Sequence, residues 1–370
     1  MNQKIKPIAI YLPQFHPIPE NDLWWGKGFT EWTNVTKAKP RFEGHYQPHL
    51  PTDLGFYDLR LEETRLAQEA MAKEYGIHGF CYYHYWFNSK RLLHEPLDRK
   101  MQNPKEDLPF MMCWANENWT RTWDGLDKEI LLKQEYSFDD DYNHIRYLIS
   151  FFKDDRYIKV QGKPVFIIYR PNLFPDVQKT IKIWRKAVQN AGFPDLYLGY
   201  SQNVENQFPP EGMGFDFAFE FQPNFGAQSE KISYGVTRME RIKHRLKVLL
   251  GYRIKKRLGI KLNRFESYQD YSNYSNVQIS LGFKKDVYPG ITPMWDNSAR
   301  RKENPFVLHN STPEKYKSWL NHIKESYPWY AIPEKFLFIN AWNEWAEGNH
   351  LEPCQKWGTA YLEVTKEVLR

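Results

Sequence analysis

Eight short apolar runs recur along the chain, and stretches with helical periodicity separate most of them. Strands that alternate with helices form a parallel sheet, because parallel neighbours need a crossover connection. Eight such units predict an α/β fold closed as a (β/α)8 TIM barrel. A doubly wound sheet is the alternative, but no glycine-rich G-x-G-x-x-G turn follows the first run. We therefore expect a single (β/α)8 domain over residues 1–370, with apolar runs at Ile8, Gly79, Leu108, Pro164, Leu196, Phe215, Tyr288 and Phe336.

Start signals mark several of the expected helices. Asp58 precedes an apolar pattern of helical spacing, Ser137 is followed three residues later by an acid, and Thr312 stands before Pro313. A long loop with several tryptophans lies between the first apolar run and Asp58. Loops of this length in compact domains are usually functional or disordered, and the tryptophans argue against disorder.

The basic charge of the chain is concentrated in one segment. Residues 238–264 hold eleven Lys and Arg and one acid, Glu240, and the whole chain carries a formal net charge of +6. The rest is therefore mildly acidic, unlike a nucleic-acid-binding surface, and we expect no nucleic-acid partner. We expect a basic, partly helical insertion over 229–287, between the sixth and seventh strands. It either contacts an anionic membrane peripherally, as basic amphipathic helices do, or packs as a solvated insertion on the barrel.

The cysteine content and the hydropathy of the chain indicate the cellular compartment in which we expect the protein. The chain has three cysteines, too few and too scattered for a disulfide framework, and Cys81 and Cys113 lie in apolar runs. Neither a secretion signal nor an apolar stretch of membrane length is visible. We expect a cytoplasmic protein, with a peripheral position at the inner membrane face if the basic segment binds lipid.

The stretch Phe336–Pro353 carries the strongest candidates for chemistry. Its apolar start leads directly into a segment rich in acids and aromatic residues, as strand ends do at the active sites of barrels. Glu344 and Glu347 stand three residues apart, so a turn can place them on one side. Paired carboxylates are the usual machinery of glycoside cleavage. A solvated acidic loop is the alternative, but such loops rarely hold residues like Trp342 and Trp345. We predict Glu344 and Glu347 as catalytic residues.

Polar and aromatic residues follow most of the other runs in the same way. Aromatic rings there can stack against sugars, although protein interfaces also use them. We predict contacts with substrate for Tyr11, His16, Trp25, Glu31, Trp32, His84, Tyr85, Trp86, Asn116, Glu117, Trp119, Trp123, Asp124, Tyr169, Gln202, Glu220, Trp295, Asp296, Asn343, Trp345 and His350.

Some of these residues have structural alternatives. Asp296 can serve a turn or a helix cap instead of a sugar hydroxyl. Glu220 stands between phenylalanines, where a carboxylate needs a partner, and it either orients a catalytic residue or pairs with Arg170. Lone histidines such as His16 and His84 are more often structural than functional.

Cofactor motifs are missing from the sequence. No set of His, Cys and Asp has zinc-type spacing, and we find neither a P-loop nor a G-x-S-x-G elbow. The acids of 139–141 stand at a predicted helix start, where the helix dipole favours them. We expect no metal and no cofactor, and an oligosaccharide or polysaccharide as the partner.

Four motifs together resemble the WbsX-like family: Tyr11-Leu-Pro-Gln-Phe-His-Pro, Trp25-Gly-x-Gly-Phe-Thr-Glu-Trp-x-Asn-Val, Trp114-Ala-Asn-Glu-Asn-Trp and Asn343-Glu-Trp-x-Glu-Gly. The family belongs to bacterial surface-polysaccharide gene clusters, including those for lipopolysaccharide O-antigen, and is described as glycosyltransferases. The last motif also resembles, more distantly, the endo-α-mannosidases of glycoside hydrolase family 99. These are (β/α)8 barrels that use no metal.

The second resemblance implies a mechanism. Glu347 matches that family's general acid/base, and Glu344 matches the carboxylate that deprotonates the 2-hydroxyl of the sugar. The 2-oxygen then attacks the anomeric carbon, which gives a 1,2-anhydro sugar and net retention. The route needs a 2-hydroxyl trans to the leaving group, as in α-mannose and α-rhamnose. Asn349 and His350 stand where the mannosidases have a Thr-Gln pair.

We therefore expect a retaining enzyme that cleaves or transfers an α-manno-configured linkage in a bacterial surface polysaccharide. A glycosyltransferase of O-antigen or capsule biosynthesis is the first alternative, although no nucleotide-binding turn is visible. A glycan-binding barrel without catalysis is the second.

Overall fold

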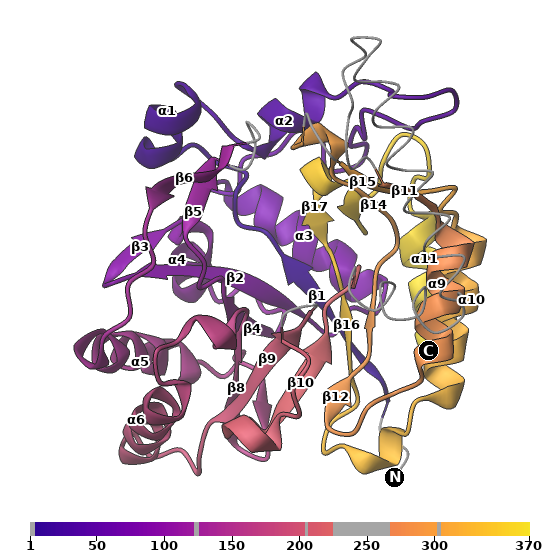
Figure 1. Cartoon of the computed structure of the whole chain (residues 1–370). Helices are drawn as coiled ribbons and strands as arrows, with labels where there is room; N and C mark the ends of the chain where they lie inside the picture. Colours follow the sequence, from indigo (N-terminus) through magenta and orange to yellow (C-terminus); the bar gives the residue numbers. More distant parts are fainter. Residues whose placement is uncertain (1–3, 122–125, 204–205, 225–266, 302–304) are drawn as a thin grey trace, which may run out of the picture.

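The computed structural model describes the chain over five stretches, residues 4–121, 126–203, 206–224, 267–301 and 305–370. A ring of parallel strands occupies the centre and helices surround it (Figure 1). The predicted (β/α)8 barrel is confirmed. The predicted basic segment 238–264 lies outside the described residues.

The strands of the ring pair in the order β12-β10-β9-β8-β4-β2-β1-β16-β13, and all of these pairs are parallel. Pro289 alone separates β12 from β13, so the two ends of this order are halves of one barrel strand and the ring closes. The strands are β1 (Lys6–Tyr11), β2 (Gly79–Phe87), β4 (Phe110–Trp114), β8 (Lys163–Ile168), β9 (Tyr197–Gln202), β10 (Phe217–Glu220), β12 (Val287–Tyr288), β13 (Gly290–Ile291) and β16 (Phe336–Ile339).

Gly290 lies where the ring closes. A Cβ atom there would lie 1.7 Å from the backbone oxygen of Glu220, so only glycine permits β13 to approach β10 this closely.

Helices follow most barrel strands. They are α3 (Glu62–Glu74), α4 (Glu95–Gln102), α5 (Phe138–Phe152), α6 (Val177–Asn190), α9 (Tyr271–Leu281), α10 (Pro313–Ser326) and α11 (Ala360–Leu369). Ser137 and Thr312 cap α5 and α10 as predicted, because their side-chain oxygens accept the backbone N–H three residues later. Asp58 does not cap α3. That helix begins after Leu61, and the Asp58 carboxylate binds Arg60 instead.

The seventh strand is shorter than its apolar run suggested. The barrel takes only Val287–Ile291, and Trp295 and Asp296 form β14 (Trp295–Asp296) in a separate sheet with β15 (Phe306–His309) and β11 (Ser267–Asp270). This small sheet lies above the carboxyl ends of the barrel strands, together with α1 (Pro19–Trp25) and α2 (Glu31–Lys37) (Figure 1). The same end carries β5 (Trp119–Arg121), β6 (Leu126–Leu132), β17 (Asn343–Glu344) and β18 (Asn349–His350).

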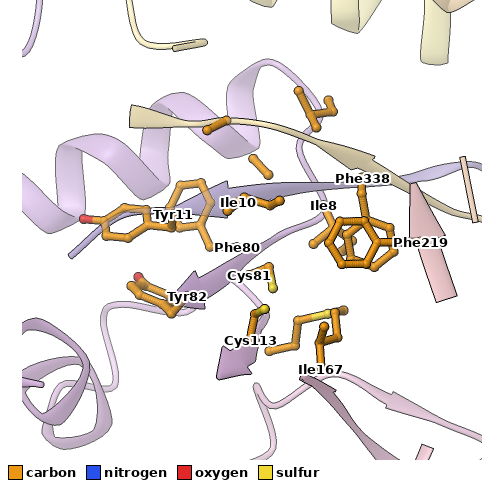
Figure 2. Close-up of a cluster of buried hydrophobic side chains, with 14 of the residues drawn as sticks. Ile8, Ile10, Tyr11, Phe80, Cys81, Tyr82, Cys113, Ile167, Phe219 and Phe338 are labelled. Atoms are coloured by element: carbon orange, nitrogen blue, oxygen red, sulfur yellow. The ribbon is translucent and has the colours of Figure 1, made fainter. Parts of the chain in front are cut away.

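Side chains alternate between the barrel interior and the helix layer. Figure 2 shows Phe219 and Phe338 ring against ring beside Ile8, with Tyr11 in a separate group. The Phe219 and Phe338 ring centroids are 4.3 Å apart although their strands are not hydrogen-bonded neighbours, so they meet inside the barrel. Tyr11 instead donates to Gln68 of α3. Because successive side chains of a strand point to opposite faces, only alternate residues can reach the space enclosed by the ring.

No helix among the described residues is long and apolar enough to cross a membrane.

Candidate active site

A cleft of about 550 Å³ opens at the carboxyl ends of the barrel strands. Its volume lies within the range of ligand pockets, roughly 300–1,000 Å³. Its walls combine aromatic rings, amides and charges: Leu12, Gln14, Tyr83, Tyr85, Phe87, Ala115, Glu117, Asn118, Trp119, Thr120, Tyr169, Phe221, Trp295, Asn297, Arg300, Arg301, Phe306, Glu344 and Glu347.

A short hairpin after β16 presents the two predicted catalytic carboxylates to this cleft. Strands β17 and β18 pair antiparallel, with one 3-10 turn between them over Trp345–Glu347. Gly348 ends the turn with a φ of 52°. A Cβ atom on Gly348 would lie 2.8 Å from the Cβ of Asp296, so glycine meets both the backbone and the packing requirement. Glu344 and Glu347 consequently face the same cavity.

Two asparagines anchor the loops that carry acidic residues. The Asn343 amide accepts from the backbone N–H of Leu12 at 2.8 Å and donates to its carbonyl at 3.0 Å. The Asn116 amide clamps the backbone of Arg170 in the same manner, at 2.7 and 2.8 Å. Each amide thus continues the strand pairing beyond the barrel rim, and the residue after it is a glutamate of the cleft.

One guanidinium holds three carboxylates together at the floor of the cleft. Arg300 lies 2.8 Å from Glu344 and 3.1 Å from Glu31 through Nη2, and 2.9 Å from Glu347 through Nη1. Its planar fork of donors fixes both predicted catalytic groups relative to each other. Three acids against one base leave this cluster with excess negative charge when all are ionised.

Burial and the excess negative charge both shift the pKa values of the groups in this cluster. Burial raises the pKa of Glu344 to about 8, Arg300 opposes the shift, and the neighbouring Glu347 and Glu31 add to it. Burial also raises the pKa of Glu31, again against Arg300. The surrounding carboxylates raise the pKa of Arg300, although burial opposes them. Glu344 is almost fully buried, whereas the Glu347 side chain keeps 21% of its exposure. Glu347 is therefore the carboxylate that an incoming ligand meets first.

Behind the hairpin, Glu352 fixes the turn between the two catalytic candidates. Its carboxylate accepts from Trp345 Nε1 at 2.6 Å, from the Tyr57 hydroxyl at 2.7 Å and from Gln68 Nε2 at 2.7 Å. Burial raises the pKa of Glu352 to about 7, and these donors oppose the rise. Because Trp345 stands between Glu344 and Glu347, its hydrogen bond to Glu352 helps to hold the backbone that carries both.

Aromatic rings form the opposite wall. The Trp119 ring of β5 stacks on Tyr85, with centroids 5.3 Å apart and 26° between the planes, and also lies near Phe87. Glu117 lies beside them and pairs with Arg170 at 2.6 Å. Flat ring faces next to a charge-assisted pair suit a ligand with apolar faces and a polar rim, as a pyranose has.

Several predicted substrate contacts lie in the wall of the cleft, and Glu31 lies directly behind it on Arg300. Those in the wall are Tyr85, Glu117, Trp119, Tyr169 and Trp295, besides Glu344 and Glu347.

Three strand residues face the helix layer instead of the cleft. Tyr11 donates to Gln68, and Trp86 donates to Asp140 of α5 at 3.0 Å. His84 lies 2.9 Å from His144 of the same helix. The prediction of substrate contact is wrong for these side chains because it ignored the alternation: Tyr85, between His84 and Trp86, points inward.

Buried aromatic and imidazole groups account for further predicted contacts outside the wall. Trp32 donates to the Tyr57 carbonyl, and Trp345 stacks on His350 with centroids 3.8 Å apart. His16 is fully buried, which lowers its pKa to about 4. Trp25 is half-buried against Phe29. These side chains stabilise the loops above the barrel.

The remaining predicted contacts are polar. Asn116 and Asn343 are buried clamps of the backbone, as described above. Gln202 is buried and accepts from Lys284 at 3.3 Å. Glu220 is half-buried outside the cleft wall, and burial raises its pKa to about 7.

Asp296 serves a turn, which was the structural alternative to contact with a sugar hydroxyl. It caps a 3-10 turn through Ser298 N–H and also binds His45 at 2.6 Å and Gln47 at 2.7 Å. Trp123 and Asp124 lie outside the described residues.

Arg300, the central cation of the site, was not among the residues predicted from the sequence. It follows β14 in a polar stretch with no local pattern, and its partners Glu31 and Glu344 lie 269 and 44 residues away. Leu12, Tyr83 and Phe221 were also missed, although a strict count of alternate strand positions would have found them. Among the described residues, no group of three or more His, Cys, Asp or Glu is arranged to hold a metal ion.

Comparison with known proteins places the chain in a family. The family model described as Glycosyltransferase WbsX matches residues 7–365. A Xanthomonas campestris pv. campestris protein named Uncharacterized protein WxcX is 39% identical over 368 residues, covering 98% of this chain and 49% of that protein. The chain thus spans about half the length of the curated relatives it matches.

Solved structures show the same fold at low identity. A glycoside hydrolase-like protein is 15% identical with a TM-score of 0.58, over 100% of this chain and 95% of that one. The GH99 endo-alpha-mannosidase from Bacteroides thetaiotaomicron is 13% identical with a TM-score of 0.58, over 100% and 97%. At these identities the likeness concerns the TIM-barrel fold alone.

Proposed function

The chain belongs to the WbsX glycosyltransferase family, a family of carbohydrate-active enzymes, and we propose that it cleaves or transfers an α-manno-configured glycosidic linkage with retention. One observation carries the proposal. Glu344 and Glu347, three residues apart in one hairpin, converge on Arg300 at the floor of a cleft with an aromatic wall. Two carboxylates in different environments are the groups that glycoside chemistry requires.

The first step divides two proton transfers between the carboxylates. Glu344 takes the proton of the sugar's 2-hydroxyl, and O2 forms a bond to the anomeric carbon as the bond to the leaving oxygen breaks. Glu347 gives its proton to that oxygen. The product is a 1,2-anhydro sugar with inverted anomeric configuration.

The second step reverses these roles. Glu347 removes a proton from water, whose oxygen attacks the anomeric carbon, and Glu344 returns the first proton to O2 as the three-membered ring opens. Two inversions give retention. An acceptor hydroxyl in place of water gives transfer instead of hydrolysis.

Burial supports this division of roles. The raised pKa of Glu344 makes its carboxylate a stronger base than a solvated one, which a weakly acidic hydroxyl requires. The partial exposure of Glu347 suits a group that exchanges protons with a leaving or entering oxygen. Arg300 keeps both carboxylates in one orientation before substrate arrives.

The stereochemistry defines the substrate class. Attack by O2 requires it trans to the leaving group, so α-mannose and α-rhamnose fit and α-glucose does not. We propose a bacterial surface polysaccharide as the source of this linkage, in keeping with the family.

Glycosyl transfer from an activated sugar is the second candidate, and the family description favours it. Incubation with α-mannosyl and α-rhamnosyl oligosaccharides, with and without nucleotide sugars, separates the two candidates. Reducing-end products formed without nucleotide sugar, of retained configuration by NMR, support the proposal. Turnover that depends strictly on a nucleotide sugar overturns it in favour of the transferase, and the Glu347→Gln variant serves as the blank.

A further inference from the structure

A second cavity, separate from the catalytic candidates, shares the Trp295 side chain with the cleft as a lining residue. Its volume is about 370 Å³, which is large enough for one small ligand. Neither the two carboxylates of the hairpin nor Arg300 lines it. Its lining includes Phe42, Tyr46, His49, His309, Lys356 and Trp357, and also the two acids Glu43 and Asp296.

A chain of hydrogen bonds determines which nitrogen of His49 is free to accept. His350 Nδ1 lies 2.8 Å from the carbonyl oxygen of Glu352, which can only accept, so Nδ1 carries the proton. Burial lowers the pKa of His350 well below its usual value, so its Nε2 is an acceptor. His49 Nδ1 lies 3.1 Å from that Nε2 and must donate.

His49 is neutral as well, because burial lowers its pKa to about 4. Its one proton is on Nδ1, and its Nε2 therefore keeps a lone pair. His49 lines the cavity, and the Tyr46 backbone also hydrogen-bonds its ring. The cavity thus contains a hydrogen-bond acceptor of fixed position that suits a hydroxyl donor.

Lys356 supplies a positive charge at the same cavity. Its Nζ lies 4.8 Å from the ring centroids of both Tyr46 and Trp357, so two rings position the ammonium. No carboxylate lies within 4 Å of it in the described ranges. The charge is exposed and available to an anionic group.

The walls are held rigidly. Phe42 stacks on His45 with centroids 4.4 Å apart and 6° between the planes. His45 accepts from the backbone N–H of Arg41 at 3.0 Å and donates to Asp296 at 2.6 Å. A ligand therefore meets a site whose groups are already ordered, which lowers the entropic cost of binding.

We propose that this second cavity binds a pyranose that carries an anionic group. The sugar ring packs on the Tyr46 and Trp357 rings, the anion pairs with Lys356 Nζ, and a hydroxyl donates to His49 Nε2. A carboxylate of a uronic acid and a phosphate ester share this chemistry. The site goes beyond the proposed reaction, since it uses none of the catalytic groups.

Isothermal titration at low ionic strength tests the proposal with three probes: glucuronic acid, mannose 6-phosphate and mannose. We expect at least one acidic probe to bind more tightly than mannose. Lys356→Met should weaken the affinity for that acidic probe about tenfold, which is the effect of losing one charge-assisted contact. The affinity for mannose should be unchanged. Lys105→Met is the matched control, because the Lys105 side chain is 76% exposed and does not line the cavity. This variant should bind the probes as wild type does. The preferred acidic probe identifies the anion.

Two further variants separate this site from the cleft. Trp357→Ala should weaken the affinity for all three probes. Glu347→Gln should bind the acidic probe with wild-type affinity even when turnover is lost. Equal affinity of wild type and Lys356→Met for the acidic probes, loss of their binding in Glu347→Gln, or no binding of either acidic probe to wild type overturns the proposal. None of these results depends on whether the cleft is a glycosidase.

Discussion

Two buried clusters of charged side chains differ in how their charges balance. In the first, the balanced cluster beside α3 and α4, Arg65 pairs with Glu106 at 2.8 Å and Lys100 pairs with Glu69 at 2.5 Å, so two cations meet two anions. In the second, the cleft cluster at the floor of the cleft, Arg300 alone meets three carboxylates.

The balanced cluster satisfies its oxygens more completely. Glu69 also accepts from the backbone N–H of Leu108, and Glu106 also accepts from the Asn103 side chain. In the cleft cluster, Glu31 Oε1 is buried with no partner among the described residues. Burial raises the pKa of Glu69 in the balanced cluster as well, so the clusters differ in the unpaired oxygen of Glu31 and in the excess of carboxylates around Arg300. The balanced cluster suits a role in stability, and the excess charge of the cleft cluster is consistent with the reaction proposed above.

The largest expected effect is on turnover at the cleft cluster. Glu347→Gln removes the proton donor and should lower the turnover of the glycan identified as substrate about 10²–10⁴-fold, the usual contribution of an acid–base group. Folding should be unaffected, because Glu347 is partly exposed. Steady-state rates and circular dichroism measure both. Glu363→Gln, on the exposed face of α11, is the control, and a Glu347→Gln variant with normal turnover would remove the assigned role.

Breaking the balanced cluster should instead cost stability. Arg65→Met leaves Glu106 buried without its cation, and we expect a loss of about 3–5 kcal/mol in the free energy of unfolding. Urea unfolding measures it. Arg99→Ala breaks an exposed pair with Glu95 and should cost less than about 1 kcal/mol. Similar losses in the free energy of unfolding for both variants would show that burial does not determine how much each ion pair contributes to stability.

Removal of Arg300, the cation of the cleft cluster, should shift the dependence of kcat/KM on pH. Arg300 lowers the pKa of Glu344, so Arg300→Met should raise that pKa further. Because the mechanism needs Glu344 ionised and Glu347 protonated, one limb of the wild-type profile of kcat/KM against pH should have its midpoint near pH 8, where Glu344 titrates. In Arg300→Met this limb should move to higher pH. A limb that stays in place in Arg300→Met would contradict the effect of Arg300 on the pKa of Glu344.

A fourth expected effect is the pH dependence of stability at Glu344. Its folded pKa is raised from 4.5 to about 8, so the folded state holds a proton that the unfolded state has released between these values. Stability from this group is fully present below about pH 4.5 and is lost as the pH rises through about 8. Glu344→Gln should therefore unfold at a higher temperature than wild type at pH 9, with the difference vanishing near pH 4. A constant difference across this range would contradict the raised pKa.

Much of the architecture was predictable from the sequence because its signals are local. The apolar runs predicted the barrel, and the cap residues Ser137 and Thr312 predicted two helix starts. The short spacing of Glu344 and Glu347 predicted that both would face one side. Motif resemblance also predicted the family that the family model confirms.

Predictions at single strand residues failed where the two faces of a strand had to be told apart. His84, Tyr85 and Trp86 are consecutive polar or aromatic residues, and composition treats them alike. In the structure, Tyr85 lines the cleft while His84 and Trp86 contact α5. A slip of one residue reverses the face of a strand, so the register of the barrel is needed to make the distinction.

The sequence by itself determined a parallel barrel and a turn with two carboxylates on one side, because periodicity and close spacing act within a few residues of each other. Only the tertiary structure decided that Arg300 joins those carboxylates to Glu31, which lies 269 residues away from it. Ion pairs between distant segments leave no local pattern, since Coulomb attraction depends on separation in space and not along the chain. The electrostatics of the site is therefore a property of the folded molecule.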